Sequence, residues 1–120
     1  MTKTNQRLET TPTFREIDNA TVLDEALHSP RAVLYKHSTR CPVSSYAIEE
    51  VLDFADEHPE CTVYVLKVIE QRALSDTAAK KLGVRHESPQ AFVILDGQTV
   101  WHGSHNAITA NALMTKVTSR

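Results

Sequence analysis

Residues 36–44 read KHSTRCPVS and lie between two apolar segments of different periodicity. The continuous apolar run at residues 32–35 is typical of a buried strand, whereas residues 46–57 have the apolar spacing of an amphipathic helix. Cys41 is therefore expected at a turn from a strand into a helix. The first turn of a helix carries a partial positive charge and unpaired N–H groups, both of which stabilise a thiolate. We expect the pKa of Cys41 to lie below that of a free cysteine, which is about 8.5.

Three neighbours of Cys41 fit this interpretation. Arg40 places a cation next to the sulfur, and Pro42 suits the first position of a helix, where its missing N–H has no partner in any case. Ser44 follows three residues after Cys41, so the motif is Cys-x-x-Ser and the second thiol of a dithiol redox motif is absent. The simpler alternative is that Cys41 is only a small buried apolar residue.

The length and charge of the chain limit its organisation and its partners. Its 120 residues suit a single domain, expected at residues 14–120, after a polar, Thr-rich tail at residues 1–13 that we expect to be mobile. Lys and Arg total 13 against 15 Asp and Glu, without a basic cluster, so neither nucleic acid nor an anionic membrane surface is an expected partner. No apolar run reaches membrane-spanning length and no signal sequence is apparent, which favours the cytoplasm.

Cys61 is the second cysteine of the chain. In the reducing cytoplasm we expect no structural disulfide between Cys61 and Cys41. The helix expected between them would place the two residues roughly 20 Å or more apart, whereas a disulfide needs Cα atoms within about 7 Å. Cys61 is therefore expected to fill space at the start of a strand.

Hydrophobic periodicity and turn residues predict eight elements. They are a short helix capped by Thr21 and stopped by Ser29 and Pro30, a strand at 32–37, a helix from Pro42 to about Glu57, a strand at 61–69, a helix capped by Ser75 and ended by Gly83, strands at 91–95 and 99–102, and a helix at 106–117.

The order of these elements predicts an α/β thioredoxin-like fold. Two strands joined by a long helix should be parallel, in a right-handed crossover. Asp96-Gly97-Gln98 is a hairpin signal, so the last two strands should be antiparallel. A parallel pair followed by a hairpin and a final helix predicts a mixed four-stranded sheet with helices on both faces.

Three blocks of the sequence resemble the YtxJ-type monothiol bacilliredoxins of the bacillithiol system. They are residues 36–44, residues 84–90 (VRHESPQ) and residues 101–105 (WHGSH), and the resemblance extends in register over about residues 16–118. It implies that Cys41 attacks a mixed disulfide between a client protein and a small thiol, releases the client reduced and retains the small thiol. Bacillithiol is then the co-substrate, a separate reductant frees Cys41, and no cofactor is tightly bound. The residues themselves do not distinguish bacillithiol from glutathione or another small thiol.

The resemblance also gives a role to Ser88-Pro89, just before the third predicted strand. In thioredoxin-like proteins a cis-proline at this place lies against the reactive cysteine. A proline has no N–H to donate to a thiolate, and the backbone of Ser88 could pair with an extended thiol ligand. The alternative is a trans proline that only ends a loop.

Gly103, Ser104 and His105 are further candidates for binding the substrate. They are expected to open the final helix, whose free N–H groups could bind a carboxylate of the substrate. It is as plausible that Ser104 or Asn106 only caps this helix. His86 and His105 could line the rim of the site and modulate the charge balance of the thiolate.

Other classes of site have little support in the sequence. The six histidines form no His-Glu-x-x-His motif and there is no Cys-x-x-Cys, so no metal site is expected. The three glycines form no phosphate-binding loop, and Ala47 stands where a Cys-x5-Arg phosphatase would have its arginine. The main rival to an oxidoreductase is a non-catalytic thioredoxin-like module in which Cys41 binds a partner or senses redox state. A protein disulfide isomerase is disfavoured by the missing second cysteine of the motif.

Overall fold

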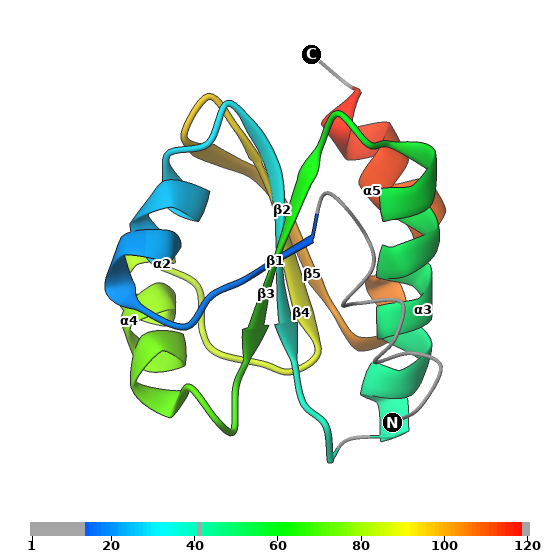
Figure 1. Cartoon of the computed structure of the whole chain (residues 1–120). Helices are drawn as coiled ribbons and strands as arrows, with labels where there is room; N and C mark the ends of the chain where they lie inside the picture. The colour runs from blue at the N-terminus through cyan, green and yellow to red at the C-terminus, as the bar shows by residue number, and fades with distance from the viewer. Residues whose placement is uncertain (1–13, 41, 119–120) are drawn as a thin grey trace.

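A five-stranded mixed sheet forms the centre of the computed structural model, which describes residues 14–40 and 42–118 (Figure 1). Strand β3 is parallel to β1 and to β2, whereas β4 is antiparallel to β2 and to β5. The α/β class and the mixed sheet are as predicted, and the predicted tail at residues 1–13 lies outside the described residues. The strands, in the spatial order β1-β3-β2-β4-β5, are β1 (Phe14–Glu16), β3 (Thr62–Lys67), β2 (Arg31–His37), β4 (Gln90–Leu95) and β5 (Gln98–Ser104).

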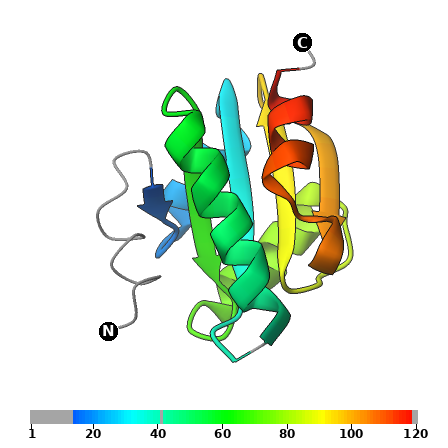
Figure 2. The same cartoon turned by 90° about the vertical axis from the view of Figure 1, so that its right-hand side faces the viewer.

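Helices cover both faces of the sheet. Helices α2 (Ala20–Leu27) and α4 (Arg72–Leu82) lie on one face, and α3 (Pro42–Glu57) and α5 (Ala110–Val117) lie on the other (Figure 1). Figure 2 shows α3 and α5 side by side, with α3 over the middle of the sheet. The sheet therefore separates two apolar cores, one against each pair of helices.

Strand β2 is buried on both faces, as its continuous apolar sequence predicts. Val33 and Tyr35 belong to the core under α3 and α5, whereas Ala32 and Leu34 belong to the core under α2 and α4. Successive side chains of a strand alternate between faces. Lys36 therefore points toward α2 and α4, where its side chain is fully buried.

Two of the three glycines lie where a positive φ is required. Asp96 and Gly97 have φ of 51° and 75° and form the two-residue turn between β4 and β5. Positive φ at both positions is characteristic of a type I′ hairpin turn, which confirms the predicted hairpin. Gly83, with φ of 68°, ends α4 in the left-handed conformation, and its N–H donates to the Ala79 carbonyl, as predicted for a helix end.

The structure corrects several predicted boundaries. The sheet has five strands, not four, because the three-residue strand β1 is too short to show periodicity. Asn19, not Thr21, caps α2, since its Oδ1 accepts a hydrogen bond from the Val22 N–H. Helix α4 begins at Arg72, so Ser75 lies inside the helix and does not cap it.

Candidate active site

The segment that carries the predicted nucleophile joins the end of β2 to the start of α3. Strand β2 ends at His37 and α3 begins at Pro42, so the predicted strand-to-helix turn is present on both sides of Cys41. Cys41 itself lies outside the described residues. Because Lys36 pairs with Gln90 across β2 and β4, this turn is at the same end of the sheet as the loop that precedes β4 (Figure 1).

Ser44 holds the backbone of this turn. Its side chain is buried, and its Oγ accepts a hydrogen bond of 3.4 Å from the Ser38 N–H. Ser38 Oγ in turn accepts one of 3.4 Å from the Arg40 N–H. The side chains of Arg40 and Pro42 are exposed. The serine of the Cys-x-x-Ser motif therefore stabilises the backbone of the turn through a hydrogen bond. The spacing of the motif alone did not predict this role.

His37 lies beneath the same turn and belongs to a small buried polar group. Its Nδ1 is 3.2 Å from the hydroxyl of Tyr35, which also donates a 3.5 Å hydrogen bond to the Ser44 carbonyl. Burial lowers the pKa of His37, and the nearby charge of Lys67 lowers it further. We therefore expect a neutral imidazole at this position at pH 7.

The Ser88–Pro89 peptide bond is cis, in agreement with the sequence-based prediction. Pro89 is buried, and its carbonyl accepts a 3.0 Å hydrogen bond from the His105 N–H. The buried side chain of Gln90 holds the loop at residues 85–87. Gln90 Nε2 donates to the Arg85 carbonyl, and Gln90 Oε1 accepts from the Glu87 N–H. The cis-proline is thus held in place from both sides.

The helix start predicted at Gly103, Ser104 and His105, on which the carboxylate site was based, is wrong. Gly103 and Ser104 pair with β4 as part of β5, and the N–H of His105 is already bonded to Pro89. His105 opens only a 3₁₀ turn, η1 (His105–Ala107). Extended backbone at Ile108 separates η1 from α5, so no continuous helix begins at residue 106.

Gly103 has a packing role instead. A Cβ atom at this position would lie 2.6 Å from the ring of Trp101, a distance that real side chains do not adopt. The start of α5 is also occupied, because Thr109 Oγ1 accepts from the Ala112 N–H and Glu50 Oε1 accepts from the Ala110 N–H. Two N–H groups of the first turn of α5 are therefore already bonded within the protein.

The two candidate histidines do not share a site. His86 lines a pocket with Ser38 and Ser88, beside the cis-proline. His105 lines another pocket, with Tyr46, between α3 and η1. Of these two residues, only His86 lies next to both the Ser38 turn and the Ser88 loop.

Lys36 is a residue of the site that the sequence analysis did not single out. Its Nζ lies 3.1 Å from His86 Nδ1, 3.5 Å from the Ser75 carbonyl and 6.0 Å from the centre of the Phe92 ring. Burial lowers the pKa of Lys36 to about 8, opposed by the carboxylate of Asp76. The alternation of β2 could have placed this charge in the core, since residues 32, 34 and 36 share one face.

Comparison with known families agrees with this arrangement. A family model described as monothiol bacilliredoxin BrxC matches residues 13–113. This chain belongs to the monothiol bacilliredoxin family. As in the sequence analysis, the residues that match include the turn at 36–44 and the loop at 84–90.

Solved structures similar to this bacilliredoxin share the thioredoxin fold. One, described as having a thioredoxin fold, is 31% identical with a TM-score of 0.80, over 87% of this chain and 93% of its own. Mitochondrial thioredoxin 3 from Saccharomyces cerevisiae is 15% identical with a TM-score of 0.71, over 92% and 98% of the two chains. A mutant thioredoxin from Halobacterium salinarum NRC-1 is 18% identical with a TM-score of 0.66, over 87% and 90%. The predicted fold is therefore confirmed.

The other cysteine of the bacilliredoxin chain is remote from the turn at Cys41. Cys61 precedes β3 at the end of the sheet where β2 begins, since Thr62 pairs with Ala32. Its side chain is completely buried, and burial raises the pKa of the Cys61 thiol to about 12. The 16-residue helix α3 separates the two segments along the chain. Cys61 is a core residue, as the sequence predicts.

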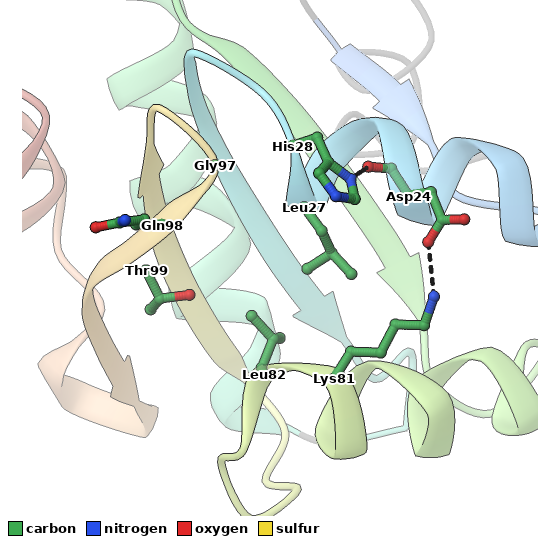
Figure 3. Close-up of a pocket in the computed structure, with 8 residues that line it drawn as sticks. All are labelled: Asp24, Leu27, His28, Lys81, Leu82, Gly97, Gln98 and Thr99. Atoms are coloured by element: carbon green, nitrogen blue, oxygen red, sulfur yellow. Dashed lines mark hydrogen bonds and ion pairs between the residues drawn. The ribbon is translucent and has the colours of Figure 1, made fainter.

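A third pocket, of about 480 Å³, lies at the end of the sheet remote from the Cys41 turn (Figure 3). It is bounded by the C-terminal ends of α2 and α4 and by the β4–β5 hairpin, and a 2.7 Å ion pair joins Lys81 to Asp24 at its edge. It contains none of the residues of the bacilliredoxin site. Among the described residues, no cluster of His, Cys, Asp and Glu could hold a metal ion, and no helix is long and apolar enough to cross a membrane.

Proposed function

We propose that this chain is a monothiol thiol-disulfide oxidoreductase that removes a low-molecular-weight thiol, with bacillithiol the first candidate, from mixed disulfides of client proteins. The thiolate of Cys41 attacks the sulfur of the small thiol, so a disulfide forms between Cys41 and the small thiol while the bond to the client breaks. The client thiolate leaves and takes a proton. A second thiol or another external reductant then attacks the Cys41 adduct and regenerates the free cysteine.

The observation that carries this proposal is the placement of a strand-to-helix turn next to a buried cis-proline loop, with no resolving thiol nearby in the sequence. The turn 38–42 and the Ser88-Pro89 loop lie at one end of the sheet. The position that holds the second cysteine of a dithiol motif is occupied by Ser44, whose hydroxyl is engaged with the Ser38 N–H. Membership of the monothiol bacilliredoxin family and the thioredoxin fold support thiol-disulfide chemistry.

The burial of Cys61 also favours a monothiol route. A thiol with a pKa near 12 is almost entirely protonated at pH 7, and the thiolate is the reactive form in disulfide exchange. Cys61 is therefore not available to resolve an adduct on Cys41 within the same chain. The reductant must come from outside the molecule.

A turnover experiment distinguishes this enzyme from a non-catalytic or sensing module on the same fold. The substrate is a model protein with one exposed cysteine in mixed disulfide with bacillithiol, supplied in large excess with free bacillithiol and a reductant that regenerates it. We expect many equivalents of reduced client per equivalent of enzyme from the natural chain and from Cys61→Ala, and none from Cys41→Ser.

The adduct provides a second readout. After a single turnover without reductant, mass spectrometry should find the small thiol attached to Cys41. Release of one equivalent of client and no more, with reductant present, would support the binding or sensing module and contradict the proposed enzyme. A parallel series with a glutathionylated client tests the identity of the small thiol.

A further inference from the structure

A pocket of about 330 Å³ lies between α3 and the η1 turn, and we call it the Tyr46 pocket. Its lining is partly apolar, because it includes Ala47 and Ile108, which are both almost completely buried. Tyr46 also lines it and is 78% exposed, the most exposed large apolar side chain in the described part of the chain. An exposed tyrosine beside an apolar hollow is a common feature of surfaces that bind other proteins.

The Tyr46 pocket adjoins both segments of the proposed reaction site. Tyr46 is four residues after Pro42, where α3 begins, so it lies about 6 Å along the helix from its start. On the other side, His105 lines the pocket, and its N–H donates to the carbonyl of the cis Pro89. An extended peptide rises about 3.3 Å per residue. A client side chain about two to four residues from the thiolated cysteine therefore reaches this pocket.

His105 gives the pocket a preorganised wall. Its φ of 53° is in the left-handed region, which residues other than glycine seldom adopt. Two backbone hydrogen bonds hold this conformation, since the His105 N–H donates to Pro89 and the His105 carbonyl accepts from the Ile108 N–H at 3.2 Å. Backbone in such a conformation is concentrated at binding and active sites. A wall that is already ordered lowers the entropy cost of binding a partner.

The acidic residues of the Tyr46 pocket indicate the charge of its partner. Glu49 and Glu50 line the pocket, and no lysine or arginine does. They are three and four residues after Tyr46, so all three share one face of α3. Glu50 Oε1 accepts from the Ala110 N–H, which fixes this carboxylate and leaves its second oxygen to accept another hydrogen bond. Helix α3 as a whole has five acidic residues and no lysine or arginine.

We propose that the Tyr46 pocket binds an arginine side chain of the client protein, close in the client sequence to the thiolated cysteine. The guanidinium group stacks on the ring of Tyr46 and donates to the carboxylates of Glu49 and Glu50. Its methylene groups pack on Ala47 and Ile108. A planar guanidinium stacks on aromatic rings and matches carboxylates better than an ammonium group does. This assignment rests on the proposed function, and it names the class of client that the enzyme prefers.

The test compares peptides that differ at one position. Each peptide has one cysteine in mixed disulfide with bacillithiol and, three residues before or after it, arginine, lysine, citrulline or glutamate in an otherwise neutral sequence. Citrulline has the shape of arginine without its charge. On the side of the cysteine that faces the pocket, we expect kcat/KM for arginine to exceed that for citrulline about two- to fivefold, as is usual for exposed charge pairs. Lysine should lie between them and glutamate should be lowest, and high salt should reduce the differences.

Variants of the enzyme assign this preference to the pocket. Glu49→Gln and Tyr46→Ala should each lower the ratio of the arginine rate to the citrulline rate toward one. Glu50 is kept because it also bonds the start of α5. The matched control is Glu57→Gln, which removes an exposed carboxylate from the other end of α3, outside the pocket, and should keep the natural ratio. Equal rates for arginine and citrulline, or an equal effect of Glu57→Gln and Glu49→Gln, would overturn the assignment.

A binding measurement separates failure of this assignment from failure of the proposed function. In Cys41→Ser, titration with the arginine peptide, with serine in place of its cysteine, should shift the amide NMR signals of Tyr46, Glu49 and Asn106. The citrulline peptide should shift them less. If no mixed disulfide is reduced but these arginine-dependent shifts occur, the proposed function fails and the pocket stands. If all peptides are reduced at the same rate and the shifts do not depend on arginine, the enzyme stands and the pocket assignment is wrong.

Discussion

Lys36 Nζ lies 3.1 Å from His86 Nδ1, so a residue of the central strand is joined to the loop that ends in the cis Ser88–Pro89 bond. The two residues are 50 positions apart in the chain. Burial lowers the pKa of both groups, and the charge of Lys36 lowers that of His86 further. A single internal contact therefore links the buried cation to the geometry of the proposed site.

The first prediction concerns the cost of burying Lys36. In the folded protein its pKa is about 8, against an ordinary value of 10.5, so the unfolded chain binds more protons between these values. The cost of burying Lys36 is therefore absent above pH 10.5, where the lysine is neutral in both states. As the pH falls, the free energy of unfolding decreases, and the full cost is reached below pH 8. We expect Lys36→Met to be more stable than the natural chain at pH 7, by on the order of 1–3 kcal/mol.

Urea unfolding of both proteins between pH 7 and 10 provides the measurement. The difference between their free energies of unfolding should shrink as the pH rises. The difference is the relevant quantity because the raised pKa of Cys61 makes both proteins less stable at alkaline pH, in the opposite direction. A difference that is independent of pH would contradict the lowered pKa of Lys36.

The second prediction concerns the reactivity of Cys61. Because this thiol is completely buried and its pKa is raised to about 12, N-ethylmaleimide at pH 8 should modify one cysteine in the native protein and both in urea. Peptide mapping should place the native label on Cys41. Cys41→Ser is the matched control, and rapid labelling of its remaining cysteine under native conditions would show that Cys61 is accessible.

The third prediction concerns one charge on α3. The carboxylates of an amphipathic helix usually form a solvated face, but Glu50 Oε1 accepts a 3.0 Å hydrogen bond from the Ala110 N–H, at the start of α5. A carboxylate at the N-terminus of a helix acts as a cap and complements the helix dipole. Glu50→Ala should therefore lower the free energy of unfolding by about 1 kcal/mol.

Glu50→Gln separates the hydrogen bond from the charge, since the amide oxygen can still accept from the Ala110 N–H. We expect Gln to restore part of the stability lost in Ala, as measured by urea unfolding at low and high salt. Equal free energies of unfolding for the natural chain and both variants would mean that the hydrogen bond between Glu50 and the Ala110 N–H does not contribute to stability.

Much of the fold could be predicted because the main elements carry strong local signals. The apolar run in β2, the stripe of α3 and the Asp96-Gly97 turn each specify one conformation without help from the rest of the chain. Strand β1 was not predicted, because three residues are too few to show a hydrophobic period and its pairing with β3 depends on tertiary contacts. The break at Ile108 was not predicted either, because the helical spacing of apolar residues continues across it.

The site was predictable where it depends on the chain's local geometry and not where it depends on packing. The turn at Cys41 follows from the local sequence, and the cis-proline was expected from the resemblance to thioredoxin-like proteins. The alternation of β2 indicates that Lys36 points into the core, but its contact with His86 does not follow from the sequence, because it depends on how α4 and the loop before the cis-proline pack over β2. The hydrogen bond from the His105 N–H to the Pro89 carbonyl also did not follow from the sequence, and it means that this N–H group is not free for a ligand.

The last prediction tests Ser44, the residue that makes the motif monothiol. Its hydroxyl accepts the Ser38 N–H at 3.4 Å in a buried setting, so Ser44→Ala should cost about 0.5–1.5 kcal/mol of stability. Ser44→Cys places a second thiol one helical turn after Cys41, as in dithiol motifs. After reaction with a thiolated client, this variant should release the small thiol to solution and retain an internal disulfide, because the new thiolate can attack the adduct on Cys41. Thiol titration and mass spectrometry distinguish the two products. Persistence of the adduct in Ser44→Cys would show that a thiol at residue 44 does not resolve it and would contradict this prediction.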